Sequence, residues 1–174
     1  MRVVAGEYRG RRLKAPPGKA TRPTADRVRE AIFNILGDVS GAVVLDLYAG
    51  SGALGIEALS RGAASATFVD SDERALAAVR ANLEAFGAVA RVVRSDTIAF
   101  LKRDEGAMYD LVFADPPYDS APKLGTGLSE LLPEVVAQDA VIVTESDKRA
   151  PLELTLPLAD ERTYGDTRIA IHRG

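Results

Sequence analysis

The 174-residue sequence contains no cysteine, which excludes disulfide frameworks, thiolate metal sites and cysteine nucleophiles. No apolar run is long enough to span a bilayer, and the N-terminal "MRVVAGEYRGRR" lacks the hydrophobic core of a signal peptide. The single histidine, His172, lies near the end of the last apolar segment, where we expect a structural role. These absences predict a cytoplasmic protein with no membrane segment and no metal site.

Acidic residues outnumber basic ones, but the two kinds are unevenly distributed. The first 29 residues contain nine Lys or Arg and two acids, so they carry +7 and the remaining 145 residues carry −10 of the total −3. A basic N-terminus on an acidic body is typical of a protein that meets a polyanion at one end. A solvated tail with scattered charge remains the alternative.

The basic N-terminus divides into two predicted elements. Residues 1–18 have short β-compatible pieces around Gly6 and Gly10, which indicates a small hairpin. The segment "RPTADRVREAIFNILGD" predicts a helix with Thr24 as its N-cap and Gly37 as its end. We therefore divide the chain into an extension of residues 1–38, facing RNA, and a body of residues 39–174.

From residue 42 onwards, apolar strands alternate with amphipathic helices. This alternation predicts an α/β fold with a mostly parallel sheet covered on both faces. The expected strands cover 42–48, 65–70, 90–94, 109–115 and 140–145, and the expected helices 54–62, 72–87, 96–103 and 124–136. Period-2 patterning in "PLELTLP" and "RTYGDTRIAIHR" predicts an antiparallel finish to the sheet.

In such a sheet, ligands bind beyond the carboxyl ends of the strands. After the first strand, Gly50, Gly52 and Gly55 form a GxGxxG pattern, and Asp70 ends the second strand where ribose hydroxyls need an acceptor. The pattern fits nicotinamide dinucleotides, S-adenosylmethionine (SAM) or a plain glycine-rich turn. Asp46 favours SAM, because a carboxylate beside the loop attracts an ammonium group and repels a pyrophosphate.

Two further strand ends carry candidate residues. Asp96, after the third strand, is either a helix N-cap or an acceptor for an adenine amino group. After the fourth strand, "ADPPYD" places Asp115 beside two prolines, whose carbonyls we expect to face outward unpaired, and Tyr118, an aromatic face for stacking. This set suits a planar group with an exocyclic NH₂, which the Asp115 carboxylate and the Pro116 carbonyl can hold for in-line methyl transfer.

Taken together, "LDLYAGSGALG", "FVD", "RSD" and "ADPPYD" resemble the class I SAM-dependent methyltransferases that modify exocyclic amines. With "GEYRGRRLKAPPG", "RPTADRVREAIFNIL" and "YGDTRIAIHR", nearly the whole chain resembles the bacterial (RsmD-like) enzymes that methylate N2 of one guanine in 16S ribosomal RNA. The resemblance implies a Rossmann-like fold with seven strands and an antiparallel C-terminal strand. It also implies a substrate that is a small ribosomal subunit or its assembly intermediate, and we expect a monomer.

The resemblance assigns the candidate residues in three groups. The target amine is held by Asp115, Pro116, Pro117 and Tyr118. SAM is contacted by Asp46, Tyr48, Ala49, Gly50, Ser51, Gly52, Asp70, Ser71, Ser95, Asp96 and Asp115. RNA is contacted by Arg9, Arg11, Arg12, Lys14, Arg22, Thr24 and Arg27. The alternatives are an adenine-N6 methyltransferase, since the same residues serve any exocyclic amine, and an NAD-dependent dehydrogenase.

Overall fold

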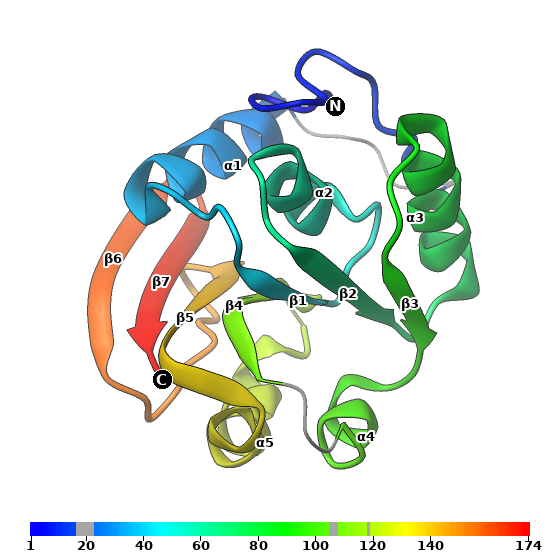
Figure 1. The fold of residues 1–174 in the computed structure, drawn as a ribbon. Coiled ribbons are helices and arrows are strands. Elements are labelled where there is room, and N and C mark those ends of the chain that lie inside the picture. The colour runs from blue at the N-terminus through cyan, green and yellow to red at the C-terminus, as the bar shows by residue number, and fades with distance from the viewer. Residues whose placement is uncertain (17–22, 105–107, 118) are drawn as a thin grey trace.

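Seven strands form one sheet in the computed structural model, which describes residues 1–16, 23–104, 108–117 and 119–174 (Figure 1). The strand order is β3-β2-β1-β4-β5-β7-β6, and only the pairings of β7 are antiparallel. The strands are β1 (Val43–Leu47), β2 (Ser65–Asp70), β3 (Arg91–Arg94), β4 (Tyr109–Ala114), β5 (Val136–Asp147), β6 (Leu158–Tyr164) and β7 (Thr167–Arg173). The expected doubly wound sheet with an antiparallel C-terminal strand is confirmed.

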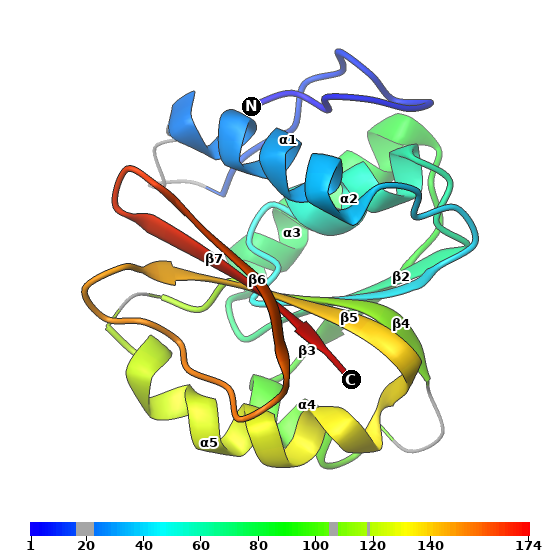
Figure 2. The same ribbon diagram turned by 90° about the vertical axis from the view of Figure 1, so that its left-hand side faces the viewer.

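Helices cover both faces of this sheet (Figures 1 and 2). One face carries α1 (Pro23–Leu36), α2 (Ala53–Ser60) and α3 (Glu73–Phe86), and the other carries α4 (Thr97–Leu101), α5 (Ala121–Leu131) and the 3₁₀ turn Leu132–Glu134. Each face has its own apolar core, with Phe33, Phe68 and Phe113 on the first and Phe100 and Leu128 on the second. The central strands are apolar on both sides because both sides are covered.

The N-terminal segment of residues 1–16 forms a hairpin-like loop outside α2 and α3 (Figure 2). Its two arms meet in a single antiparallel bridge between Arg2 and Arg12, with Val3 donating to the Arg11 carbonyl at 3.0 Å. A longer ladder does not form, because side chains of α2 accept the amide protons of Val4, Ala5 and Tyr8. The segment therefore docks on the body.

The expected start of α1 was wrong by two residues, because an N-cap at Thr24 would begin the helix at residue 25. The helix begins at Pro23, so Thr24 lies within its first turn and is not the N-cap. Proline is favoured at the first helical position, because its missing N–H has no helical partner there. The predicted end is confirmed, since Gly37 takes a φ of 73° and its amide bonds the Phe33 carbonyl at 3.0 Å.

The C-terminal part differs from the sequence pattern in one place. The predicted strand "PLELTLP" is an irregular segment, and β6 starts only at Leu158. Leu152 and Leu154 are nevertheless buried, because they pack into the core beside α5. The alternation of apolar residues therefore predicted correctly which side chains are buried. The backbone of this segment contacts α5: the Thr155 amide donates to the Ser129 hydroxyl at 2.9 Å.

Within the described parts of the chain, no helix combines the length and the apolar character that crossing a membrane requires.

Candidate functional site

The register of the sheet brings three carboxylates to one edge. Leu47 of β1 pairs with Val69 of β2 and with Ala114 of β4, so the residues that follow these strands meet at their carboxyl ends. Asp70 and Asp115 both lie close enough to Asp46 to raise its pKa electrostatically. This edge includes the central β1/β4 boundary, where the strand order reverses and where doubly wound folds bind ligands.

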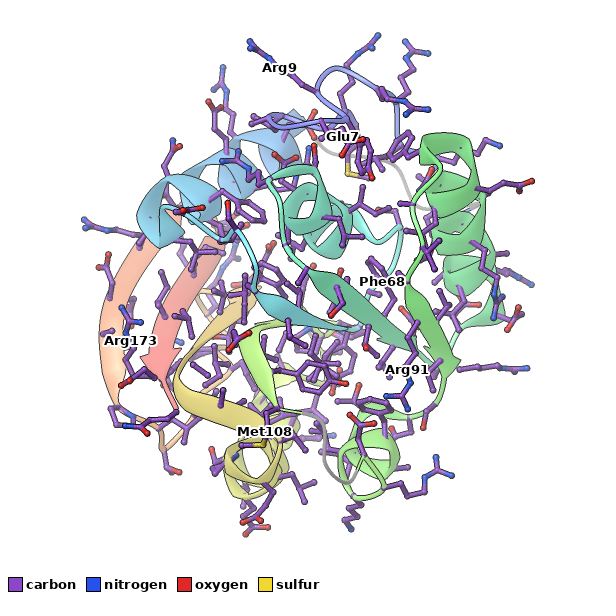
Figure 3. All side chains as sticks on the ribbon, in the orientation of Figure 1. Glu7, Arg9, Phe68, Arg91, Met108 and Arg173 are labelled. Carbon is purple, nitrogen blue, oxygen red and sulfur yellow. The ribbon has the colours of Figure 1, made fainter. Side chains whose placement is uncertain are left out.

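The glycine pattern turns the chain from β1 into α2 with little space to spare. Gly52 precedes α2 with a φ of 77°, a left-handed conformation that glycine adopts without strain. Gly55 lies inside the helix, and a Cβ there would come within 2.4 Å of the Phe68 ring and 3.1 Å of the Asp46 carboxylate. Phe68 belongs to β2 and is labelled in Figure 3. The third glycine is therefore needed for α2 to approach the sheet.

Asp70 holds the glycine loop in place. One carboxylate oxygen accepts the Gly50 amide proton at 2.9 Å, and the other accepts that of Asp72 at 2.9 Å. An ionised carboxylate has about four lone-pair directions, so these two bonds leave acceptor capacity for two hydroxyl groups. This arrangement suits a ribose next to the loop.

Asp46 has an unusual electrostatic environment. The side chain is 2% exposed, and burial raises its pKa to about 8, helped by Asp115 and Asp70 and opposed by the hydrogen bond from the Gly55 amide at 2.9 Å. A ligand with a positive charge would offset the repulsion among the three acids. A pyrophosphate would add to it.

Tyr48 and Ala49 connect β1 to the glycine loop. Tyr48 has a φ of 59°, which is rare for a residue with a side chain and costs free energy. Burial raises the pKa of its hydroxyl. The Ala49 amide bonds the Val69 carbonyl at 3.1 Å, so the strained turn is held against the end of β2. Strain of this kind is concentrated at functional sites.

The third strand end places polar groups on the outer side of the same edge. Asp96 is the N-cap of α4 and accepts the Ala99 amide proton at 3.0 Å, which confirms the capping reading of this residue. Its side chain is exposed and keeps a second oxygen for a ligand. The Ser95 amide bonds the Asp70 carbonyl at 3.1 Å, and Ser71 lies exposed beside them. The predicted SAM-contacting residues thus converge.

The "ADPP" segment leaves β4 at this edge, next to the glycine loop. Asp115 is half-buried and Pro116 is buried, while Pro117 is exposed. The expectation that both proline carbonyls stay unpaired was wrong for Pro117, because its carbonyl accepts the amide protons of Ser120 at 3.0 Å and Ala121 at 3.2 Å. Pro117 is thereby fixed to the start of α5. Tyr118 lies outside the described residues.

Most of the predicted RNA-contacting cations lie at the surface. Arg9, Arg12, Lys14 and Arg27 are exposed, and Figure 3 shows Arg9 projecting from the N-terminal segment. Arg11 is exposed but also packs over the Phe86 ring, 4.4 Å from its centroid, and donates to the Ala85 carbonyl. Arg22 and the side chain of Thr24 lie outside what the structure describes.

Sequence reasoning missed two buried polar residues that attach this segment to the body. Glu57 of α2 is fully buried and accepts the amide protons of Val4 at 2.8 Å and Ala5 at 2.9 Å, while Arg29 and Arg61 pair with it at 3.4 and 2.9 Å. A charged residue in the apolar sequence "LGIEALS" was the available signal, because an isolated acid on a buried helix face needs partners.

The second is Asn82 of α3, which is 1% exposed. Its side chain accepts the Lys14 amide proton at 2.8 Å and donates to the carbonyls of Lys14 and Ser51, both at 3.0 Å. The basic segment and the glycine loop are therefore fastened to the same side chain. Nothing in the local pattern of "RANLEAF" distinguishes Asn82 from an exposed helix residue.

Comparison with known proteins identifies the family of this chain. The family model described as "Conserved hypothetical protein 95" matches residues 1–173. The Bacillus subtilis protein named "Putative rRNA methyltransferase YlbH" is 42% identical over 99% of this chain and 98% of its own length. Ribosomal RNA small subunit methyltransferase D of Escherichia coli K12 is 46% identical over 68% of this chain and 60% of its own length.

The fold is shared with a solved relative. The structure of yhhF from Escherichia coli superposes with a TM-score of 0.84 at 36% identity, over 99% of this chain and 97% of that one. The family match covers almost every residue, and the loops described above lie inside it. The chain belongs to the Conserved hypothetical protein 95 family, within the SAM-dependent methyltransferases of class I fold.

Proposed function

We propose that this protein transfers a methyl group from SAM to the exocyclic N2 amine of one guanine in 16S ribosomal RNA. The observation that carries the proposal is that Asn82 bonds both the glycine loop and the basic N-terminal segment. The glycine loop, expected to hold SAM, and the basic segment, expected to meet RNA, bond one side chain at 2.8 to 3.0 Å. The rRNA methyltransferase names of two relatives support the choice of substrate class.

The residues at the sheet edge fit SAM on chemical grounds. Asp70 has acceptor capacity for the ribose hydroxyls. Asp46 lies next to Asp70 and Asp115, and a cationic ligand there would offset the electrostatic repulsion among the three carboxyl groups. The exposed oxygen of Asp96 suits the adenine amino group. When bound, SAM supplies a methyl group on a sulfonium, which a nucleophilic nitrogen accepts as the carbon–sulfur bond breaks.

The protein's contribution to the reaction is positioning. Asp115 and the Pro116 carbonyl accept the two amine hydrogens, which turns the nitrogen lone pair out of the base plane. We assign Tyr118 to stacking on the base. A folded RNA must release the target guanine from its stack to reach these residues. The amine proton leaves to solvent late in the transfer, so no strong general base is required.

Exposed arginines and lysines of residues 1–38 provide the contacts to RNA phosphates. Such contacts orient the RNA without reading its sequence, and they weaken steeply as salt rises. Because Glu57 and Asn82 bond the backbone of this segment to α2 and α3, its cations hold a defined position relative to the sheet.

The proposal is tested by tritium transfer from labelled SAM to small ribosomal subunits isolated from cells that lack this gene. Wild-type protein should label the 16S rRNA, and Asp115→Ala should not, even at S-adenosylmethionine concentrations raised to saturate the variant. The matched control is Asp110→Ala, an exposed acid on the same strand that bonds the Val43 amide away from the site. Labelling that survives Asp115→Ala would overturn the assignment of this residue.

An adenine-N6 activity is the second candidate, because Asp115 and Pro116 can hold any exocyclic amine. Nucleoside analysis of the labelled product separates N2-methylguanosine from N6-methyladenosine. The dehydrogenase alternative is disfavoured because the pyrophosphate of a dinucleotide would add negative charge to the cluster of Asp46, Asp70 and Asp115.

A further inference from the structure

A second arginine-lined feature lies outside the site, between β3 and α4. It is a pocket of about 370 Å³ lined by Arg91, Val93, Arg94, Phe100, Arg103 and Asp104. Strand β3 is an edge strand of the sheet, so the pocket opens at the side of the molecule. Figure 3 shows Arg91 at this side and Arg9 at the N-terminal segment, well separated from each other. The pocket is thus distinct from the basic N-terminus.

Arg91 forms the fixed wall of the pocket. Its guanidinium pairs with Asp104 at 2.7 Å, and Asp104 in turn accepts the Tyr109 hydroxyl proton at 2.7 Å. The same guanidinium lies over the Phe100 ring, 5.4 Å from the centroid. Phe100 is therefore covered and only 3% exposed, so the pocket offers guanidinium edges and no aromatic face on which a base could stack.

Arg94 and Arg103 differ from Arg91 in having neutral partners. Arg94 donates to the Ser71 carbonyl at 3.4 Å, and Arg103 donates to the Ala99 carbonyl at 3.0 Å and the Ser95 hydroxyl at 3.1 Å. In the described ranges neither forms an ion pair. By contrast, Arg149 and Arg162 lie toward the opposite end of the strand order from β3, and both form ion pairs with aspartates.

Neutral acceptors orient these two guanidiniums without cancelling their charge. Each guanidinium has five N–H donors in a planar fork, and the hydrogen bonds to these neutral acceptors use one donor of Arg94 and two of Arg103. The remaining donors match the oxygens of a phosphate, which arginine binds in a bidentate manner. Residues 30–174 carry a net charge of −10, so two neighbouring cations that pair with no acid in the described ranges favour an anionic ligand.

We propose that Arg94 and Arg103, framed by Arg91, bind a phosphodiester of the substrate rRNA. The proposal rests on the proposed function and adds a second RNA contact to it. Ser95 connects this pocket to the proposed SAM site. Its hydroxyl accepts a hydrogen bond from Arg103, and its amide donates to the Asp70 carbonyl. The substrate therefore touches the protein on both sides of the site, at the basic N-terminus and at this pocket.

The test is the double substitution Arg94→Glu and Arg103→Glu, with Arg149→Glu and Arg162→Glu as the matched control of equal charge change. Methylation of small subunits from cells lacking the gene is measured at saturating SAM. The KM for subunits should rise roughly tenfold or more in the pocket variant, with kcat at saturating SAM within about threefold of wild type. In the pocket variant, the slope of log KM against log salt concentration should be smaller by about one for each phosphate contact that is lost.

A pocket variant whose KM and salt dependence match those of the control would overturn the proposal. The single change Arg94→Ala guards against misfolding, because the side chain is exposed and, among the described residues, it donates a hydrogen bond through its Nε alone. It should give a smaller shift in KM in the same direction. Binding of naked 16S rRNA, measured by filter retention, should weaken in parallel. Unchanged binding of naked rRNA with weakened binding of subunits would assign the pocket to a ribosomal protein and contradict an RNA contact. Absence of methylation by wild-type protein would instead refute the proposed function.

Discussion

The side-chain amide of Asn82 donates a hydrogen bond to the Ser51 carbonyl at 3.0 Å while the same side chain pairs with both backbone groups of Lys14. Asn82 thus joins the glycine loop after β1 to the basic segment before α1, two parts of the chain that are more than thirty residues apart in sequence. A buried carboxamide with all these groups satisfied favours one arrangement of loop and segment over others.

We expect Asn82→Ala to lower the free energy of unfolding by about 3 kcal/mol, because it removes the partner of the buried Ser51 carbonyl and of two part-buried backbone groups of Lys14. The KM for SAM and the KM for RNA should both rise. Urea unfolding and steady-state kinetics measure these effects. The matched control is Asn34→Ala, an exposed asparagine on α1, for which the stability change should stay within roughly 0.5 kcal/mol. Equal changes in the free energy of unfolding for the two variants would show that the Asn82 hydrogen bonds do not stabilise the fold.

Gly55→Ala should destabilise the protein by roughly 2 kcal/mol or more, since the new Cβ would lie 2.4 Å from the Phe68 ring inside a packed core. The affinity for S-adenosylhomocysteine should fall as well, because α2 would be displaced from the loop that precedes it. Thermal unfolding and calorimetric titration are the measurements. Gly127→Ala on α5 is the control: its Cβ would meet only the flexible end of Ile98, at 3.1 Å, and helix propensity favours alanine. A stable Gly55→Ala protein with normal ligand affinity would contradict the packing described here.

Asp46 predicts a pH dependence of both stability and binding. Its pKa is raised from an ordinary value near 4 to about 8, so between these pH values the folded state binds more protons than the unfolded state. The free energy of unfolding contributed by this group therefore falls as pH rises from about 4 to about 8. The Asp46→Asn variant should lose that part of the pH dependence in ligand-free protein, as measured by urea unfolding across this range.

The same group predicts proton release when SAM binds. A cationic ligand beside Asp46 lowers the carboxyl pKa, so binding at pH 7 should expel up to about one proton. Calorimetric titrations in buffers of different ionisation enthalpy measure this number. Asp46→Asn should abolish the release and weaken binding, whereas Asp110→Asn, an exposed acid, should do neither. A wild-type enthalpy that is independent of the buffer would contradict this account of Asp46.

Asp115→Asn should reduce kcat by roughly 100-fold or more while changing the S-adenosylhomocysteine Kd less than tenfold, because the amide keeps the shape of the side chain but loses the charge that positions the amine. Single-turnover methylation separates this effect from product release. A variant with normal kcat and weakened cofactor binding would leave Asp115 with its cofactor contact alone and remove it from the target site.

Local sequence patterns predicted the elements of the fold because strands and helices here are specified by apolar runs and glycine ends. The strand 65–70 and the end of α1 at Gly37 follow directly from such signals. The "PLELTLP" segment misled because period-2 burial does not require a ladder partner, and α5 began earlier than expected because Ser120 and Ala121 bond the Pro117 carbonyl.

The site was predictable in part for a physical reason. Residues at the carboxyl ends of parallel strands gather at one edge of the sheet whatever the details of packing, so Asp46, Asp70 and Asp115 could be placed together from the pattern of strands and helices alone. The attachments made by Glu57 and Asn82 could not, since each bonds a segment about 50 to 70 residues away in sequence. The pairing of Pro117 was hidden in the same way, because it depends on where α5 starts.

The most direct test of the central claim is mass spectrometry of 16S rRNA fragments from cells with and without this gene. We predict that one guanosine carries a methyl group on N2 in cells with the gene, that the group is absent without it, and that purified protein with SAM restores it on isolated subunits. An identical methylation pattern in both cell lines, or a methyl group lost from an adenosine instead, would contradict the account.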